Sequence, residues 1–239
     1  MIRDLRTIVW RESRDFRRQI AGHVGLFLFF AFAGGILAPN SYFRSQPLSS
    51  ENDWMLDGIA LLTAFVYAGL ISESSFFEER SNGTMQTLLS TALRPLAMFL
   101  GKWLWMMAQA TIMIIVIFVC HRVVELTFRS SAWPASRPGP GSLAWAVFVM
   151  FFAWSLCSFV VASNAVLSLV VPNTGLGRLA SALFLAVPFL GAYGFHTLFG
   201  VEWDRGMMFY VGGLCIVLSL VAFLSACVAF RSERTRLWL

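Results

Sequence analysis

Six apolar runs constrain this chain more than any other feature of its sequence. They cover residues 20–38, 54–72, 100–120, 143–171, 179–200 and 207–230. A helix needs about 20 predominantly apolar residues to cross the hydrocarbon core of a bilayer, and several runs reach this length. Backbone groups in lipid must form hydrogen bonds within their own segment, which favours helices over strands. The sequence therefore predicts an all-α integral membrane protein with six transmembrane helices.

The composition agrees with this prediction. Of the 239 residues, 58% are hydrophobic and 13% are charged, and a soluble domain of this length would need more charge to cover its surface. The net charge of +5 raises the question of nucleic-acid binding. In a membrane chain, however, basic residues collect where loops face the cytoplasm and anionic lipid. We expect a lipid bilayer as the partner and no nucleic acid.

The basic residues also predict the orientation. An even number of spans places both termini on one side of the membrane. Of the 18 Lys and Arg residues, five then fall on the side opposite the termini, which leaves 13 on the same side as the termini. The five are Arg44, Arg122, Arg129, Arg137 and Arg205. This bias predicts that both termini are cytoplasmic.

Residues 1–19 precede the first run and have the pattern of an amphipathic helix. Their apolar residues, with the first residue of the run, recur at helical spacing on one face. These are Ile2, Leu5, Val9, Phe16 and Ile20. Arginines and acids occupy most of the remaining positions. We expect a helix in the cytoplasmic interface, with Leu5, Val9 and Phe16 in lipid and the arginines among headgroups. An unstructured basic tail would not need this spacing.

A long polar interruption, "FFEERSNGTMQTLLSTALRPLAMFLGK", separates the second and third runs. Glu78, Glu79 and Arg80 precede a Ser-Asn-Gly turn signal, and apolar residues at helical spacing follow. Pro95 ends this helix, because the residue before a proline avoids the helical region, and it suits the start of the next helix. The sequence predicts a short cytoplasmic helix that presents charged residues outwards, within a loop over residues 73–101.

The residue order in this segment resembles that of ABC-2-type transporter permeases. In that family an acidic residue and a Gly-Thr pair precede Leu-Leu, a proline-containing stretch follows, and Gly-Lys opens the third span. The matching positions are Glu79, Gly83, Thr84, Leu88, Leu89, Pro95, Gly101 and Lys102. The match covers residues 78–102, and the amphipathic first helix and six spans around it agree with the family. The sequence departs at Arg94, where small or apolar residues are common in the family.

The resemblance implies a coupling helix, in the loop over residues 76–94, that docks onto a separate ATPase subunit. The implied coupling residues are Glu78, Glu79, Arg80, Asn82, Gly83, Thr84, Leu88 and Leu89. It also implies the permease subunit of an ATP-driven exporter in a bacterial plasma membrane. Two permease subunits, identical or different, would enclose the substrate path above two ATPase subunits. ATP and Mg would bind to the ATPase.

The sequence itself indicates neither ATP hydrolysis nor ion-driven transport by this chain. A phosphate-binding P-loop needs G-x-x-x-x-G-K-[ST], whereas Gly101-Lys102 is followed by Trp103 and opens an apolar run. The central parts of the runs contain no Asp, Glu, Lys or Arg, although such residues mark ion paths in membranes. We expect no bound cofactor, and energy supplied by a partner.

No pattern of catalytic or metal-binding residues stands out. His23, His121 and His196 lie near the predicted membrane edges, and none has an acid or cysteine nearby in sequence. The cysteines form no C-x-x-C pair, so small buried hydrophobic residues are expected at Cys120, Cys157, Cys215 and Cys227. The sequence therefore predicts no metal site and a protein that is not an enzyme.

We expect one membrane domain over residues 1–239. Its parts are an interfacial helix (1–19), a six-helix bundle (20–230) and a cytoplasmic tail (231–239). The fourth run exceeds the bilayer core as a straight helix, which makes Ser163-Asn164 a candidate break. Two other functions stay open: a haem-exporter-type permease of cytochrome c maturation, and a membrane scaffold that docks a cytoplasmic protein without transport.

Overall fold

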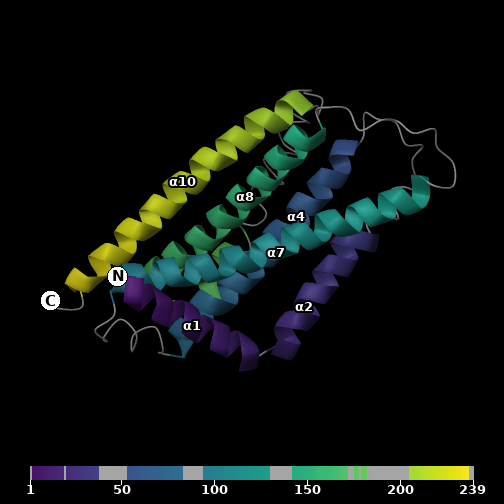
Figure 1. Cartoon of the computed structure of the whole chain (residues 1–239). Helices are drawn as coiled ribbons and strands as arrows, with labels where there is room; N and C mark the ends of the chain where they lie inside the picture. Colours follow the sequence, from purple (N-terminus) through teal and green to yellow (C-terminus); the bar gives the residue numbers. More distant parts are fainter. Residues whose placement is uncertain are drawn as a thin grey trace.

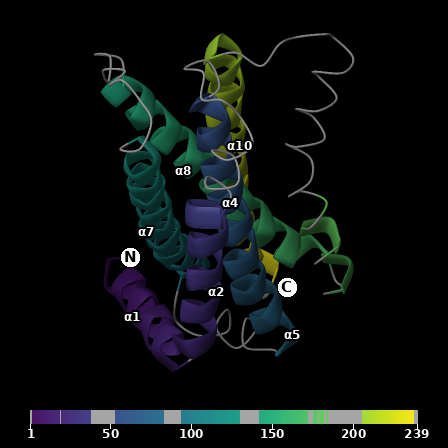
Figure 2. The same ribbon diagram turned by 90° about the vertical axis from the view of Figure 1, so that its right-hand side faces the viewer.

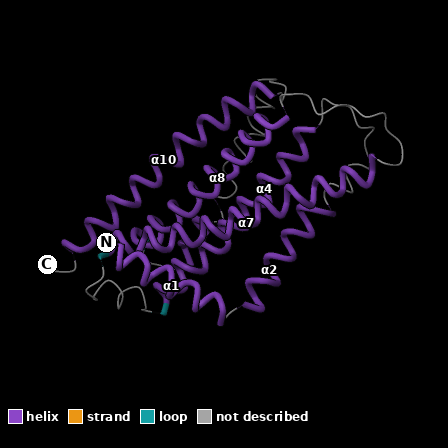
Figure 3. Tube along the Cα trace, viewed as in Figure 1, coloured by secondary structure: helices purple, strands orange, loops and turns teal. Residues whose placement is uncertain are grey.

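The computed structural model describes residues 2–18, 20–37, 53–82, 94–129, 142–171, 175–177, 179–181, 183 and 205–236. Within these ranges all regular structure is helical, which confirms the predicted all-α class for the described part of the chain (Figure 3). The main helices are α1 (Ile2–Arg18), α2 (Ile20–Phe32), α4 (Asp53–Glu73), α7 (Pro95–Arg129), α8 (Ser142–Val170) and α10 (Arg205–Arg236).

Three short elements continue these helices. The π-helical turns η1 (Ala33–Leu37) and η2 (Ser74–Glu78) extend α2 and α4. The short helix α5 (Glu79–Ser81) follows η2 directly. A π-helical turn accommodates one more residue than an α-helical turn, and such turns often occur at functional sites.

Within the described residues, four helical segments are long and apolar enough to cross a membrane: Ala60–Glu78, Pro95–Cys120, Val147–Val170 and Val211–Arg231. They coincide with the second, third, fourth and sixth predicted runs. The apolar helix Val24–Leu37 in the first run is shorter. Most of the fifth run, 179–200, lies outside the described residues, so the count of six spans stays a prediction.

The long helices form one bundle (Figures 1 and 2). α8 packs against both α4 and α10, and α1 packs against α7. α7 begins, and α8 and α10 end, at the end of the bundle where α1 lies, which we call the α1 end. Both chain termini lie towards this end. α10 begins at the opposite end of the bundle.

Helix ends lie further into the polar segment than the hydropathy pattern predicted. Helical structure continues from α4 through Ser81, and α7 already begins at Pro95, so helical backbone extends into both ends of the predicted loop 73–101. Hydropathy marks where a helix leaves lipid, whereas backbone hydrogen bonds continue the helix beyond that point. The proline does start α7, as its position predicted. The predicted short helix before it lies outside the described residues.

The predicted break at Ser163-Asn164 is wrong, because α8 is continuous from Ser142 to Val170. Asn164 is fully buried against α4. Its Nδ2 donates hydrogen bonds to Ser72 Oγ at 2.8 Å and to the Gly69 carbonyl oxygen at 3.3 Å. The side-chain amide therefore bonds across to the neighbouring helix and leaves the backbone ladder of α8 intact.

Candidate functional site

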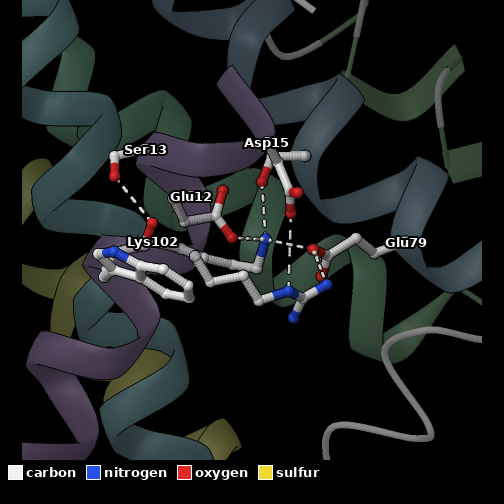
Figure 4. Close-up of polar contacts among 8 residues, drawn as sticks. Glu12, Ser13, Asp15, Glu79 and Lys102 are labelled. Atoms are coloured by element: carbon white, nitrogen blue, oxygen red, sulfur yellow. Dashed lines mark hydrogen bonds and ion pairs between the residues drawn. The ribbon is translucent and has the colours of Figure 1, made fainter. Parts of the chain in front are cut away.

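A buried lysine near the start of α7 is the centre of the candidate site. The side chain of Lys102 is only 1% exposed. Its Nζ lies 2.8 Å from Glu12 Oε1 of α1, 2.9 Å from Glu79 Oε1 of α5 and 2.8 Å from Ser75 Oγ of η2 (Figure 4). The Ser75 contact is a hydrogen bond, and the contacts to the two carboxylates are ion pairs. The buried charge is thus both paired and hydrogen-bonded.

Arg11 adds a second cation to the same group of side chains. Its Nη2 lies 3.3 Å from Glu79 Oε1, and its Nε lies 3.6 Å from Asp15 Oδ2 within α1. Glu79 Oε1 is therefore shared by a lysine from α7 and an arginine from α1. We call Arg11, Glu12, Ser75, Glu79 and Lys102 the charged junction.

A glycine allows α1 to lie directly against α7. A Cβ atom at Gly101 would lie 2.7 Å from Ile8 Cγ2 and 2.9 Å from Ile8 Cβ, which is too close for any side chain. Ile8 is 3% exposed and covers this position. Glu12 follows Ile8 by one helical turn, where it meets Lys102. Gly101 and Lys102 are thus two halves of one docking site for α1.

Arg80 connects α5 to α8. Its Nη1 donates hydrogen bonds to the Val171 carbonyl oxygen at 2.6 Å and to the Ser168 carbonyl oxygen. Carbonyl groups in the last turn of a helix lack intrahelical partners, and a cation there also interacts favourably with the helix dipole. Glu79 and Arg80 are adjacent in sequence, yet one contacts α1 and α7 and the other contacts α8.

The π-helical turn η2 sets the direction of α5. Phe76 and Phe77 are consecutive and both fully buried. The Phe76 ring lies beside Phe230 of α10, with the two centroids 6.5 Å apart, and Lys102 Nζ lies 5.7 Å from the Phe76 centroid. On the other side, Phe77 occupies the space that a side chain at Gly177 would need. Burial of both aromatic rings holds Ser75 and Glu79 in position at Lys102.

The structure divides the predicted coupling residues. Glu79 and Arg80 are partly buried and contact other helices, whereas Glu78 and Asn82 are exposed. Glu79 and Arg80 were predicted to face outwards, and this is wrong. The buried Lys102 holds Glu79 inwards, and the carbonyl groups at the end of α8 hold Arg80 inwards. The remaining predicted coupling residues, Gly83, Thr84, Leu88 and Leu89, lie outside the described residues.

The predicted first helix is present as α1, and the face that packs on the protein is not the face that was predicted to lie in lipid. Leu5 and Val9 are partly buried, and the side chain of Phe16 is outside the description. The face that packs on α7 is centred on Ile8 and Glu12, about 60° around the helix from the predicted apolar face at 3.6 residues per turn. Hydropathy could not predict that an acidic residue, Glu12, lies on the buried face. The sequence signal that could have indicated it was Lys102 inside an apolar run, because a buried lysine needs an acidic partner.

Within the described residues, no group of His, Cys, Asp and Glu side chains has an arrangement that could hold a metal ion. All four cysteines are free. Cys157 is buried as predicted, whereas Cys120, Cys215 and Cys227 are only partly buried. The charged junction joins α1, η2 and α5 to α7 through ion pairs and a hydrogen bond. No protein-family model and no curated protein matches this chain in sequence.

Proposed function

We propose that this chain is the membrane subunit of an ATP-driven exporter of the ABC-2 type. In this proposal two such subunits pair around the substrate path, and each couples through residues 76–94 to a separate ATPase subunit that binds ATP and Mg. The α1 end and both termini are cytoplasmic, and the membrane is a bacterial plasma membrane.

One observation carries the proposal: the residues of the motif that are far apart in sequence meet in one place. Glu79 comes from the start of the motif, and Gly101 and Lys102 from its end. In the structure Lys102 pairs with Glu79, and Gly101 admits the helix that supplies Glu12. The polar segment is therefore joined to the bundle at the point where a cytoplasmic partner would act on it.

The contacts of α5 suit the transmission of movement. Through Glu79 it is tied to α7 and α1, through Arg80 to α8, and through η2 it continues α4. Displacement of this short helix would thus act directly on α1, α4, α7 and α8. Buried ion pairs cost several kcal/mol in desolvation, so a connector with no mechanical role would gain little from such an arrangement.

The test is to purify the tagged chain from its own host membrane in mild detergent and measure vanadate-sensitive ATP hydrolysis in the preparation. The proposal predicts that an ATPase subunit co-purifies in stoichiometric amount. Absence of such a subunit would show that the chain is not an ABC-type permease, and a bound protein without ATP hydrolysis would favour a scaffold.

A second measurement tests the coupling role of α5. A fluorophore on Val119→Cys, in a background without native cysteines, reports movement of α7 far from the charged junction. ATP with vanadate should change its signal in the parent chain and in the control Arg231→Gln, an exposed position on α10. In Glu79→Gln the ATPase should still hydrolyse ATP while the signal stays constant. A normal signal in Glu79→Gln would exclude coupling through this carboxylate.

A further inference from the structure

The arginines of α1 are sorted onto one side of the helix. Its exposed side carries Arg3, Arg6, Trp10, Arg14 and Arg17. At 3.6 residues per turn these five positions fall within an arc of about 80°. The arc is centred directly opposite Ile8 and Glu12, the residues that pack against α7. We call this side the arginine face.

The acidic residues of α1 lie away from the arginine face. Glu12 pairs with Lys102, and Asp15 lies 3.6 Å from Arg11 on the docked side. Asp4 is also partly buried on that side. Docking of α1 on the charged junction therefore separates the charges of the helix: its acids lie on the docked side, and a surface rich in arginine turns outwards.

Trp10 gives the arginine face a character typical of the bilayer interface. Its side chain is 55% exposed, and the guanidinium carbon of Arg14 lies 5.6 Å from the ring centroid. Tryptophan is enriched at headgroup level, where its ring and its N–H group are both accommodated. A tryptophan on a surface that faced only water would leave a large apolar ring exposed.

The position of α1 along α7 also indicates that this helix lies at the level of the bilayer interface. Its contact with Gly101 lies inside the segment Pro95–Cys120, which is long and apolar enough to cross a membrane. Six residues separate Gly101 from the start of α7, or about 9 Å at a rise of 1.5 Å per residue. Helices that lie in the interface are buried about 5–10 Å into the boundary between headgroups and acyl chains. The arginine face would then lie among lipid phosphates.

We propose that the arginine face binds the phosphate groups of anionic lipids and concentrates these lipids around α1. Guanidinium groups donate paired hydrogen bonds to phosphate oxygens, and each basic residue near an anionic surface favours binding. An acidic protein surface is the other partner that this charge would fit. The exposed tryptophan and the depth of α1 favour lipid. The inference goes beyond transport and does not depend on an ATPase partner.

The experiment uses the full chain in two kinds of nanodisc with identical headgroup composition, a small fraction of phosphatidylglycerol in phosphatidylcholine. In one kind the phosphatidylglycerol carries brominated acyl chains, which quench tryptophan. In the other kind an equal amount of phosphatidylcholine is brominated instead. The chain has nine tryptophans, so the signal of Trp10 is the difference between the chain and Trp10→Phe.

We expect severalfold stronger quenching of Trp10 by the brominated anionic lipid, and a weaker preference at high salt. The pair Arg14→Gln and Arg17→Gln should reduce the preference, whereas Arg14→Lys with Arg17→Lys should keep most of it. The matched control, Arg94→Gln with Arg231→Gln, removes two exposed charges elsewhere and should leave it unchanged. Equal quenching in the two nanodiscs would overturn the proposal, and loss of a bound protein in the arginine variants alone would assign the face to an acidic partner.

Discussion

The charged junction and the interface between α4 and α8 are both buried and polar, yet they are built differently. At the junction, carboxylates from α1 and α5 meet Lys102 of α7. Between α4 and α8 the polar groups are uncharged: Asn164 bonds to Ser72 and Gly69, and Cys157 Sγ lies 3.5 Å from the Ala64 carbonyl oxygen. We call the second region the α4–α8 seam.

The difference follows from what each region joins. α4 and α8 are long apolar helices whose small residues, such as Ala64, Ala68 and Ala165, allow close packing along their length. Uncharged hydrogen bonds suffice there, and a charge would be costly. α1 and α5 are too polar or too short for apolar burial to hold them. Ion pairs at the end of the bundle provide the contacts that apolar burial alone does not.

The largest effect is expected from Lys102→Met. It leaves Glu12 and Glu79 buried without their shared cation, which costs about 3–5 kcal/mol. α1 should detach while the long helices stay together. Maleimide labelling of Ile8→Cys, a position 3% exposed in the intact protein, measures this release above the background of the native cysteines.

The matched variant combines Lys102→Met with Glu12→Gln and Glu79→Gln. Since no unpaired charge then remains, part of the lost stability should return. If Lys102→Met instead unfolds the bundle as a whole, the charged junction and the α4–α8 seam are one cooperative unit and the comparison fails.

The next largest effect is expected from Gly101→Ala. The added methyl group would overlap Ile8, and overpacking of this kind costs about 1–3 kcal/mol. Combined with Ile8→Ala, the substitution should cost less than the sum of the two single changes, as measured by thermal unfolding in detergent. If the stability losses of the two single substitutions simply add, Ile8 does not pack against Gly101.

In the α4–α8 seam, Asn164→Ala removes the hydrogen bonds to Ser72 and Gly69. Side-chain hydrogen bonds between helices in membrane proteins contribute about 0.6 kcal/mol on average and up to about 1.7. We expect a loss within this range in the free energy of unfolding, with no labelling of Ile8→Cys. The control is Ser155→Ala, whose hydroxyl donates a hydrogen bond to the Phe151 carbonyl oxygen of its own helix. Release of α1 in Asn164→Ala would link the two regions.

The smallest effect is expected from Ser158→Ala. The Trp103 Nε1 group donates to Ser158 Oγ at 3.2 Å, a long bond between uncharged groups of α7 and α8. The Trp103 ring remains held by Trp154 and Phe223, whose centroids lie 5.7 Å and 4.9 Å away. We expect a loss of about 0.6 kcal/mol or less by thermal unfolding. A larger loss than for Gly101→Ala would show that uncharged bonds, and not the charged junction, dominate the α1 end.

The sequence by itself determined the helical class, four segments that can cross a membrane and the start of α7 at Pro95, because these depend on local composition and on backbone chemistry. It also singled out Glu79, Gly101 and Lys102 as members of one motif. Only the tertiary structure decided what these residues do. The partner of Lys102 on α1 lies ninety positions earlier, and no periodicity relates Glu12 to it. The inward direction of Glu79 and Arg80 and the orientation of α1 depend on the same ion pairs. Hydropathy describes how a residue interacts with lipid or water, whereas a buried charge takes its position from the opposite charge it meets.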